Sequence, residues 1–179
     1  MEILETIPIN IRDQYKLLNY LAEGYKSLNK ALMEYIDNSF DSADDYYDDT
    51  SGRYKRNVVI IITIDRQKNA ISILDNCNGM DLDILRGLAD SINDSEKRRR
   101  EQKRPWVNGQ FGLGAHAYRF FAQELRVVSK KRGSSTASIS IDRDEPNAKL
   151  IKPLQNILND SGTYVELLDI DRQQMKHLN

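Results

Sequence analysis

One short segment of the sequence concentrates side chains that could do chemistry. Residues 34–45, EYIDNSFDSADD, contain Glu34, Asp37, Asn38 and Asp41. On a helix these four positions are spaced i, i+3, i+4 and i+7, so their side chains share one face. No lysine or arginine lies within the segment to offset the carboxylates, and asparagine is a poor residue for a helix interior. The pattern allows two interpretations: a solvated acidic face, or a face that holds a divalent cation or a water molecule for attack.

Two segments further along the chain could complete such a site. In ILDNCNGMD, a strand-like run ends at Asp75, whose carboxylate could accept from an amino group in a pocket or serve only as a turn residue. In GQFGLGA, Gly109, Gly112 and Gly114 permit positive φ angles and close backbone approach, and the helix that follows would aim N–H groups at an anion. This G-x-x-G-x-G spacing belongs neither to a P-loop nor to the dinucleotide-binding fingerprint.

Helices must carry the acidic face and the glycine-rich turn. Residues 12–44 have a helical pattern that is broken near Gly24. Its second part is predicted to bury one apolar stripe that includes Leu28, Leu32, Tyr35, Ile36 and Phe40. Residues 81–92 predict another helix, with Asp81 as its N-cap and an apolar face formed by Leu82, Leu85, Leu88, Ala89 and Ile92. His116 follows the glycines and is interpreted as a packed residue without a catalytic role.

Strands must form the surface on which these helices pack. NVVIIITI, residues 57–64, is β-branched almost throughout and predicts a strand that is covered on both faces, or at least a central strand. It forms a hairpin with residues 70–75, and four strand-like runs follow after residue 123. This order predicts an α+β fold, a two-layer α/β sandwich with a mixed, mostly antiparallel sheet and helices on one face.

Composition sets limits on the class of protein. The chain has 179 residues, which favours one domain, and its net charge of −1 gives no general attraction to nucleic acid. A single cysteine, Cys77, excludes an internal disulfide and fits a reducing compartment. The longest apolar run is too short to cross a bilayer, and the N-terminus lacks the features of a signal peptide. We therefore expect a cytoplasmic protein with no membrane partner.

The three segments together resemble the GHKL superfamily of ATP-binding domains, which includes gyrase B, heat-shock chaperones of the ninety-kilodalton class, histidine kinases, MutL proteins and MORC ATPases. The resemblance spans about residues 28–170. Its first box, E-x-x-x-N-x-x-D-x-A, is filled by Glu34, Asn38, Asp41 and Ala43, and its glycine box G-x-x-G-x-G is complete. Its second box, D-x-G-x-G, is met by Asp75 and Gly79 with Cys77 in place of the first glycine, and Thr163 matches a threonine on a late strand.

The resemblance implies a Bergerat fold that binds ATP and Mg²⁺ beneath a long lid. It implies that Glu34 is the general base, that Asn38 holds Mg²⁺, and that Asp75 accepts from the adenine amino group with support from Thr163. Met80 would pack on adenine, and the glycine turn would wrap the phosphates. The implied nucleotide-binding residues are Asn38, Asp41, Ser42, Asp75, Gly79, Met80, Gly109, Gln110, Phe111, Gly112, Leu113, Gly114, Ala115 and Thr163.

Two further regions receive a role only through the resemblance. Residues 81–108 would form the ATP lid; six basic residues at 97–104 could reach the γ-phosphate, contact nucleic acid such as DNA, or be a solvated charge run. Residues 1–27 would form an N-terminal arm and helix that dimerises with a second copy when ATP binds. The chain is expected to be a single domain, residues 1–179, and the N-terminal module of a larger protein with a downstream transducer or effector.

The predicted function is Mg²⁺-dependent ATP binding and slow ATP hydrolysis, which drive a conformational or dimerisation switch in a larger machine. Two alternatives remain at this point. One is a protein kinase module of the histidine-kinase or anti-sigma type, and the other is a nucleotide sensor that binds without turnover.

Overall fold

The computed structural model describes residues 13–90, 114–153, 157–176 and 178. In chain order its elements are α1 (Gln14–Ala22), the 3₁₀ helix η1 (Glu23–Tyr25), α2 (Leu28–Asp44), β1 (Tyr47–Asp48), β2 (Arg53–Tyr54), β3 (Ile60–Asp65), β4 (Ala70–Asp75), α3 (Leu82–Asp90), the 3₁₀ helix η2 (Gly114–Phe120), β5 (Glu124–Lys130), β6 (Ala137–Asp142), β7 (Lys149–Leu150), β8 (Gly162–Leu168) and α5 (Arg172–Lys176).

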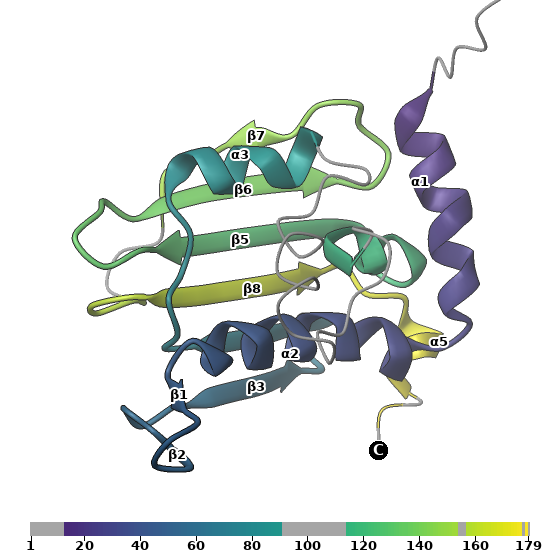
Figure 1. Ribbon diagram of the computed structural model, residues 1–179. Helices are drawn as coiled ribbons and strands as arrows, with labels where there is room; N and C mark the ends of the chain where they lie inside the picture. The colour runs from purple at the N-terminus through teal and green to yellow at the C-terminus, as the bar shows by residue number, and fades with distance from the viewer. Residues whose placement is uncertain (1–12, 91–113, 154–156, 177, 179) are drawn as a thin grey trace, which may run out of the picture.

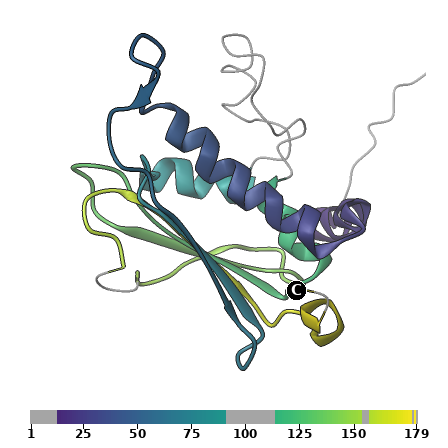
Figure 2. The same cartoon turned by 90° about the horizontal axis from the view of Figure 1, so that it is seen from below.

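Six strands form one antiparallel sheet in the order β3-β4-β8-β5-β6-β7. Helices α1, α2, α3 and η2 lie on one side of this sheet (Figures 1 and 2). The small β1–β2 hairpin follows α2 and stands apart from the main sheet. The predicted α+β two-layer sandwich is therefore confirmed.

The prediction for the β-branched run was wrong in one respect. β3 pairs with β4 as expected, but it is the edge strand of the sheet. Ile61, Ile62 and Ile64 remain 43–48% exposed. The composition of the run reflects the preference of branched side chains for extended backbone. Whether β3 is a central strand depends instead on which strand pairs with each of its edges. β8, from the far end of the chain, pairs with β4, and β3 is left at the edge.

Helix α2 begins where the sequence pattern indicated a break. Lys26 takes a left-handed conformation with φ +58°, and the Ser27 hydroxyl accepts from the Lys30 N–H at 3.3 Å, which caps α2. The break therefore depends on Lys26 and Ser27 rather than on Gly24. The buried face of α2 comprises Leu28, Ala31, Leu32, Tyr35, Ser39 and Ala43.

Two residues of the predicted apolar stripe lie outside this buried face. Ile36 is half-buried, and Phe40 is 53% exposed. Ser39 takes the position next to the sheet because a small side chain allows α2 to approach β4 closely. The predicted N-cap of α3 is confirmed, since Asp81 Oδ1 accepts from the Ile84 N–H at 3.1 Å. Leu85 is fully buried beneath α3, whereas Leu82 is exposed, contrary to the predicted face.

One buried tyrosine joins α2 to the start of η2. The Tyr35 hydroxyl donates to the carbonyl of Ala115 at 3.1 Å and accepts from the N–H of Tyr118 at 2.9 Å. Only 4% of Tyr35 is exposed, so neither backbone group has water as an easy substitute. These two hydrogen bonds fix the position of the first turn of η2 along α2.

We expect Tyr35→Phe to lower the free energy of unfolding by about 1–3 kcal/mol, because it leaves two buried backbone groups without a partner. Urea unfolding followed by circular dichroism measures this change. Tyr20→Phe is the matched control, since Tyr20 is 71% exposed. Equal stability of the two variants would contradict the proposed role of the Tyr35 hydroxyl.

His116 in η2 is packed, as the sequence predicted. It is 3% exposed, and its Nδ1 accepts from Arg119 Nε at 3.3 Å, which places the proton of the neutral ring on Nε2. Burial, and secondarily the charge of Arg119, lowers the pKa of His116 from 6.5 to about 4. The unfolded chain therefore binds a proton between these two values that the folded protein excludes.

It follows that His116 destabilises the fold as the pH falls from 6.5 through 4. Above pH 6.5 the contribution vanishes, because the ring is neutral in both states. We expect the unfolding free energy of the wild type to drop over this range by about 3 kcal/mol more than that of His116→Gln. Parallel urea titrations at several pH values test this, and superimposable pH profiles of the two proteins would refute it.

Candidate functional site

The candidate site lies where α2, the turn after β4, the start of β8 and the start of η2 meet. These elements are brought together by packing, because α2 contacts both β4 and η2. The exposed and half-buried face of α2 carries Glu34, Asn38 and Asp41, as the helical spacing predicted. Asp75 and Thr163 are direct partners in the β4–β8 register, so the sheet brings these two residues together.

Asp75 is a buried carboxylate at the end of β4. Its Oδ1 accepts from the N–H of Cys77 at 2.9 Å and from the N–H of Thr163 at 3.2 Å. Its Oδ2 accepts from the Ser39 hydroxyl at 3.0 Å. Burial raises the pKa of Asp75, and its hydrogen bonds, foremost the one from the Cys77 N–H, act in the opposite direction by stabilising the charged form.

This arrangement leaves Asp75 with a defined remaining capacity. A carboxylate oxygen accepts about two hydrogen bonds, and Oδ1 already has two backbone donors whereas Oδ2 has one donor. The second position on Oδ2 suits an N–H from a bound molecule. The orientation of the carboxylate is set by three separate parts of the chain, namely α2, the turn and β8.

The turn after Asp75 depends on one glycine. Gly79 has φ +68°, and a Cβ built there would stand 2.0 Å from the carbonyl oxygen of Lys130. The next residue, Met80, is half-buried against the core and donates its N–H to Ser129 Oγ at 2.8 Å. Ser129 Oγ also donates to the carbonyl of Gly162 at 3.1 Å and shares a 3.0 Å hydrogen bond with Thr163 Oγ1. Met80 and Thr163 are therefore held by the same hydroxyl.

Cys77 replaces a family glycine without strain. Its φ is not among the positive values in the described residues, so the added Cβ meets no backbone conflict. The side chain is fully buried, with Sγ 3.6 Å from the carbonyl of Ser39. Burial, and then the charge of Asp75, raises the pKa of the thiol to about 12. Cys77 is thus a neutral packing residue.

At the other end of the site, Glu34 lies directly against Gly114. A Cβ at Gly114 would be 2.8 Å from Glu34 Oε2, so the absence of a side chain permits this approach. Tyr25 is close by, and its pKa is raised by burial and by its interaction with the Glu34 carboxylate. The last residue of the predicted glycine turn, Ala115, is tied to α2 through the Tyr35 hydroxyl. The general-base candidate therefore faces the first residue of η2.

The remaining predicted residues fall into two groups. Ser42 Oγ accepts from the N–H of Asn78 at 3.3 Å, so it supports the turn. Asp45 accepts from Asn78 Nδ2 at 2.6 Å and reinforces the same turn. The other group lies outside the described residues and comprises Gly109, Gln110, Phe111, Gly112, Leu113 and the lid segment 91–108.

Oxygen donors on α2 fit a hard divalent cation better than a soft metal. Glu34, Asn38 and Asp41 offer carboxylate and amide oxygens on one helix face, which is the donor chemistry that Mg²⁺ prefers. In the parts of the chain that the structure describes, no three His, Cys, Asp or Glu side chains form a group able to hold a metal ion. Mg²⁺ is usually bound through one or two side chains together with phosphates.

Sequence reasoning missed the hydroxyls that support the site. Ser39, Ser129 and Tyr35 contact Asp75, Met80 and η2, respectively. Ser39 could have been found from the sequence, because it is a small polar residue on the face of α2 that the hydrophobic spacing assigns to the core. Ser129 gave no such signal, because a serine in a strand is equally compatible with an exposed position.

An antiparallel sheet with helices on one face, a buried strand-end carboxylate and an acidic helix face is the architecture of an ATP-binding domain with a Bergerat fold. The model of the histidine kinase-, DNA gyrase B- and HSP90-like ATPase family matches residues 25–172, and the chain belongs to this family. Domains of this family bind ATP, generally with Mg²⁺. Among curated proteins, none matches the chain. No helix in the described residues is both long and apolar enough to span a bilayer.

We expect Gly79→Ala to lower the unfolding free energy by more than about 3 kcal/mol, because the methyl group would overlap the Lys130 carbonyl. Gly133→Ala separates the steric effect from the conformational one, since Gly133 has φ +79° with nothing within 4 Å of its Cβ position. That control should lose only about 1–2 kcal/mol. Chemical denaturation provides both values, and similar losses would show that the Gly79 contact is relieved by movement of β5.

Proposed function

We propose that this chain binds ATP with Mg²⁺ and hydrolyses it slowly, and that the bound state drives a conformational or dimerisation switch in a larger protein. The observation that carries the proposal is the pair of sites at opposite ends of the α2 face. One end has the buried Asp75 carboxylate with acceptor capacity on Oδ2. The other has the Glu34 carboxylate against the glycine that begins η2.

Adenine would bind at the Asp75 end. The amino group of adenine is an N–H donor that matches the open position on Oδ2, and guanine would present a carbonyl oxygen at that position. Thr163 supports this end, since its N–H fixes Oδ1 and its hydroxyl is held by Ser129. Met80, half-buried beside the same turn, supplies an apolar surface for the ring.

The phosphates would bind at the Gly114 end. The absence of a Cβ at Gly114 lets the backbone come close to the Glu34 carboxylate, and Gly109–Ala115 would aim backbone N–H groups at the phosphates. Asn38 would hold Mg²⁺, and when bound this ion neutralises charge on the phosphate oxygens. Asp41 would contribute through the nucleotide's solvent shell, while Ser42 holds the turn on which adenine rests.

Glu34 would act as the general base for hydrolysis. Glu34 is half-buried, and the Tyr25 side chain interacts with its carboxylate. A carboxylate in that position can take a proton from water that attacks the terminal phosphate. The slow rate follows from the general behaviour of phosphoryl transfer, which depends on positioning by every part of the site at once.

The switch would depend on segments that flank the site. Residues 81–108 are proposed as the lid and residues 1–27 as the arm that forms a homodimer with a second copy. A downstream transducer or effector, in the same protein or in a partner, would read the closed state. The whole chain, residues 1–179, would then act as the nucleotide-binding module, and the client it serves could be DNA or another protein.

We expect Glu34→Gln to reduce the rate of ATP hydrolysis by about 10²–10⁴-fold, because the amide cannot accept the proton. ATP affinity should stay within about threefold, since the amide keeps the size of the side chain and relieves its repulsion of the phosphates. Asp37→Asn, which removes a carboxylate from the same helix, should leave turnover nearly unchanged.

Phosphate release under single-turnover conditions and calorimetry with ATP provide the two measurements. Hydrolysis at the wild-type rate in Glu34→Gln would contradict the base assignment. A stable phosphoprotein formed from labelled ATP would favour a kinase, and tight ATP binding by the wild type without phosphate release would favour a sensor.

A further inference from the structure

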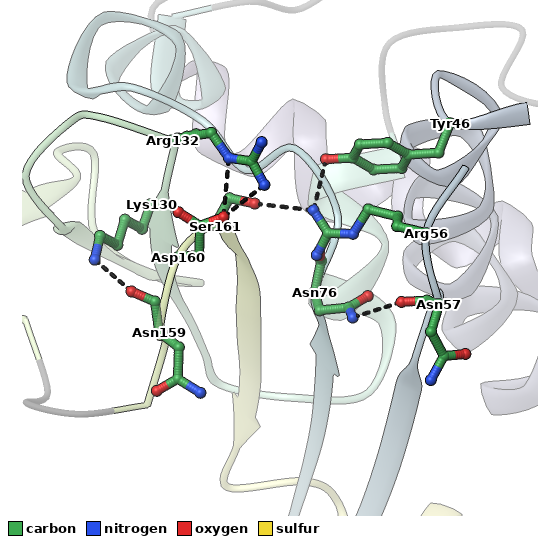
Figure 3. Close-up of polar contacts among 9 residues, drawn as sticks. All are labelled: Tyr46, Arg56, Asn57, Asn76, Lys130, Arg132, Asn159, Asp160 and Ser161. Carbon is green, nitrogen blue, oxygen red and sulfur yellow. Dashed lines mark hydrogen bonds and ion pairs between the residues drawn. The ribbon is translucent and has the colours of Figure 1, made fainter. Parts of the chain in front are cut away.

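Asn76 directly follows Asp75. Its backbone and side-chain polar groups all form hydrogen bonds with one short segment, residues 56–59. Its side-chain Nδ2 donates to the carbonyl of Asn57 at 2.9 Å, and its Oδ1 accepts from the N–H of Val59 at 2.9 Å. Its backbone N–H donates to the carbonyl of Val59 at 3.3 Å. Its carbonyl accepts from the guanidinium of Arg56 (Figure 3). The segment that precedes β3 thus fixes the first residue of the turn.

Arg56 is itself directed toward Asn76 by neutral partners. Its guanidinium lies 4.6 Å from the centre of the Tyr46 ring, and Nη1 donates to the Tyr46 hydroxyl at 3.1 Å and to Ser161 Oγ at 3.5 Å. Among the described residues, no carboxylate forms an ion pair with Arg56. Figure 3 shows the guanidinium between Tyr46, Ser161 and Asn76. Its positive charge is therefore oriented toward the Asn76 carbonyl.

The carbonyl of Asn76 belongs to the same peptide unit as the N–H of Cys77. A peptide unit is planar, so fixing its oxygen also fixes the direction of its N–H. That N–H donates to Asp75 Oδ1 at 2.9 Å. A cation at the oxygen also polarises the peptide and strengthens the hydrogen bond donated by its N–H. Arg56 thus acts on the Asp75 carboxylate through a single rigid unit.

We propose that Arg56 is a positioning residue for the recognition of adenine, because it aligns the Asn76–Cys77 peptide that orients the Asp75 carboxylate. The inference rests on the proposed function, in which Oδ2 of Asp75 accepts from the adenine amino group. Thr163 supplies the second donor to Oδ1, so the loss of Arg56 weakens one of two backbone restraints on that oxygen. The carboxylate then rotates more freely, and its contact with an amino group loses direction while the rest of the nucleotide site is unaffected.

The test compares the dissociation constants of two nucleotides, ATP and purine riboside triphosphate, which differs from ATP only in lacking the 6-amino group. Arg56→Met removes the guanidinium and its hydrogen-bond donors but retains a long side chain. Arg132→Met is the matched control, because Arg132 lies in the same cluster but pairs with Asp160 and has no contact with Asn76 (Figure 3). Calorimetry at one salt concentration gives the two affinities, one for each nucleotide, of the wild type and of each variant.

We expect Arg56→Met to reduce the preference for ATP over purine riboside triphosphate by about tenfold, while affinity for the analogue changes little. Arg132→Met should keep the wild-type preference. A general structural defect would instead weaken both nucleotides by the same factor, and that result, or an unchanged preference in Arg56→Met, would overturn the inference. If Arg56→Met does not fold, Arg56→Gln, which keeps one amide donor without the guanidinium, is judged by the same two outcomes.

The wild-type measurement separates this inference from the function on which it rests. If the wild type binds both nucleotides equally, the contact between Asp75 and the amino group is absent, and the adenine assignment fails together with the role of Arg56. If the wild type prefers ATP and Arg56→Met retains that preference, the adenine assignment stands and only the role of Arg56 is wrong.

Discussion

The site depends on a charge that is removed from water. Burying a carboxylate is unfavourable unless donors replace its hydration, and Asp75 receives donors from α2, from the turn after β4 and from β8. Each donor is fixed by its own neighbours, so α2 must lie close to β4, the turn must be tight and β8 must pair in register. Ser39 on the core face of α2, Gly79 without a Cβ and Thr163 opposite Asp75 are consequences of this one requirement.

A second set of contacts places the Glu34 end of the site on helix α2, which also carries Ser39. The Tyr35 hydroxyl fixes η2 against α2, and Gly114 then lies next to Glu34. Because Ser39 and Glu34 belong to one rigid helix, the distance between the two ends is set by helix geometry rather than by loops. A site that is to hold a base and a chain of phosphates in line benefits from such a fixed spacing.

Most of this arrangement could be predicted from the sequence, for identifiable reasons. The helical spacing of Glu34, Asn38 and Asp41 predicted a shared face, and strand-like runs predicted the antiparallel sheet, because periodicity reports which side of an element is buried. The edge position of β3 could not be predicted, since it depends on the arrival of β8 from a distant part of the chain. Phe40 was assigned to the core because the pattern is apolar there, but the buried face of α2 passes through Ser39 and Ala43 instead. Ser129 and Arg56 act through contacts between distant segments, which no local pattern records.

The exposed edge of β3 has a consequence for the behaviour of the chain in concentrated solution. A β-branched edge strand presents a row of backbone groups and apolar side chains to any other strand that approaches. Such segments promote intermolecular pairing when they carry no charge, and here the run from Val58 to Ile64 has none. Charged residues stand at its two ends, Lys55 and Arg56 before it and Asp65 and Arg66 after it, in the positions where gatekeeper residues limit aggregation. Charge at the two ends of β3 thus limits the pairing of its open edge with other chains, whether or not nucleotide is bound.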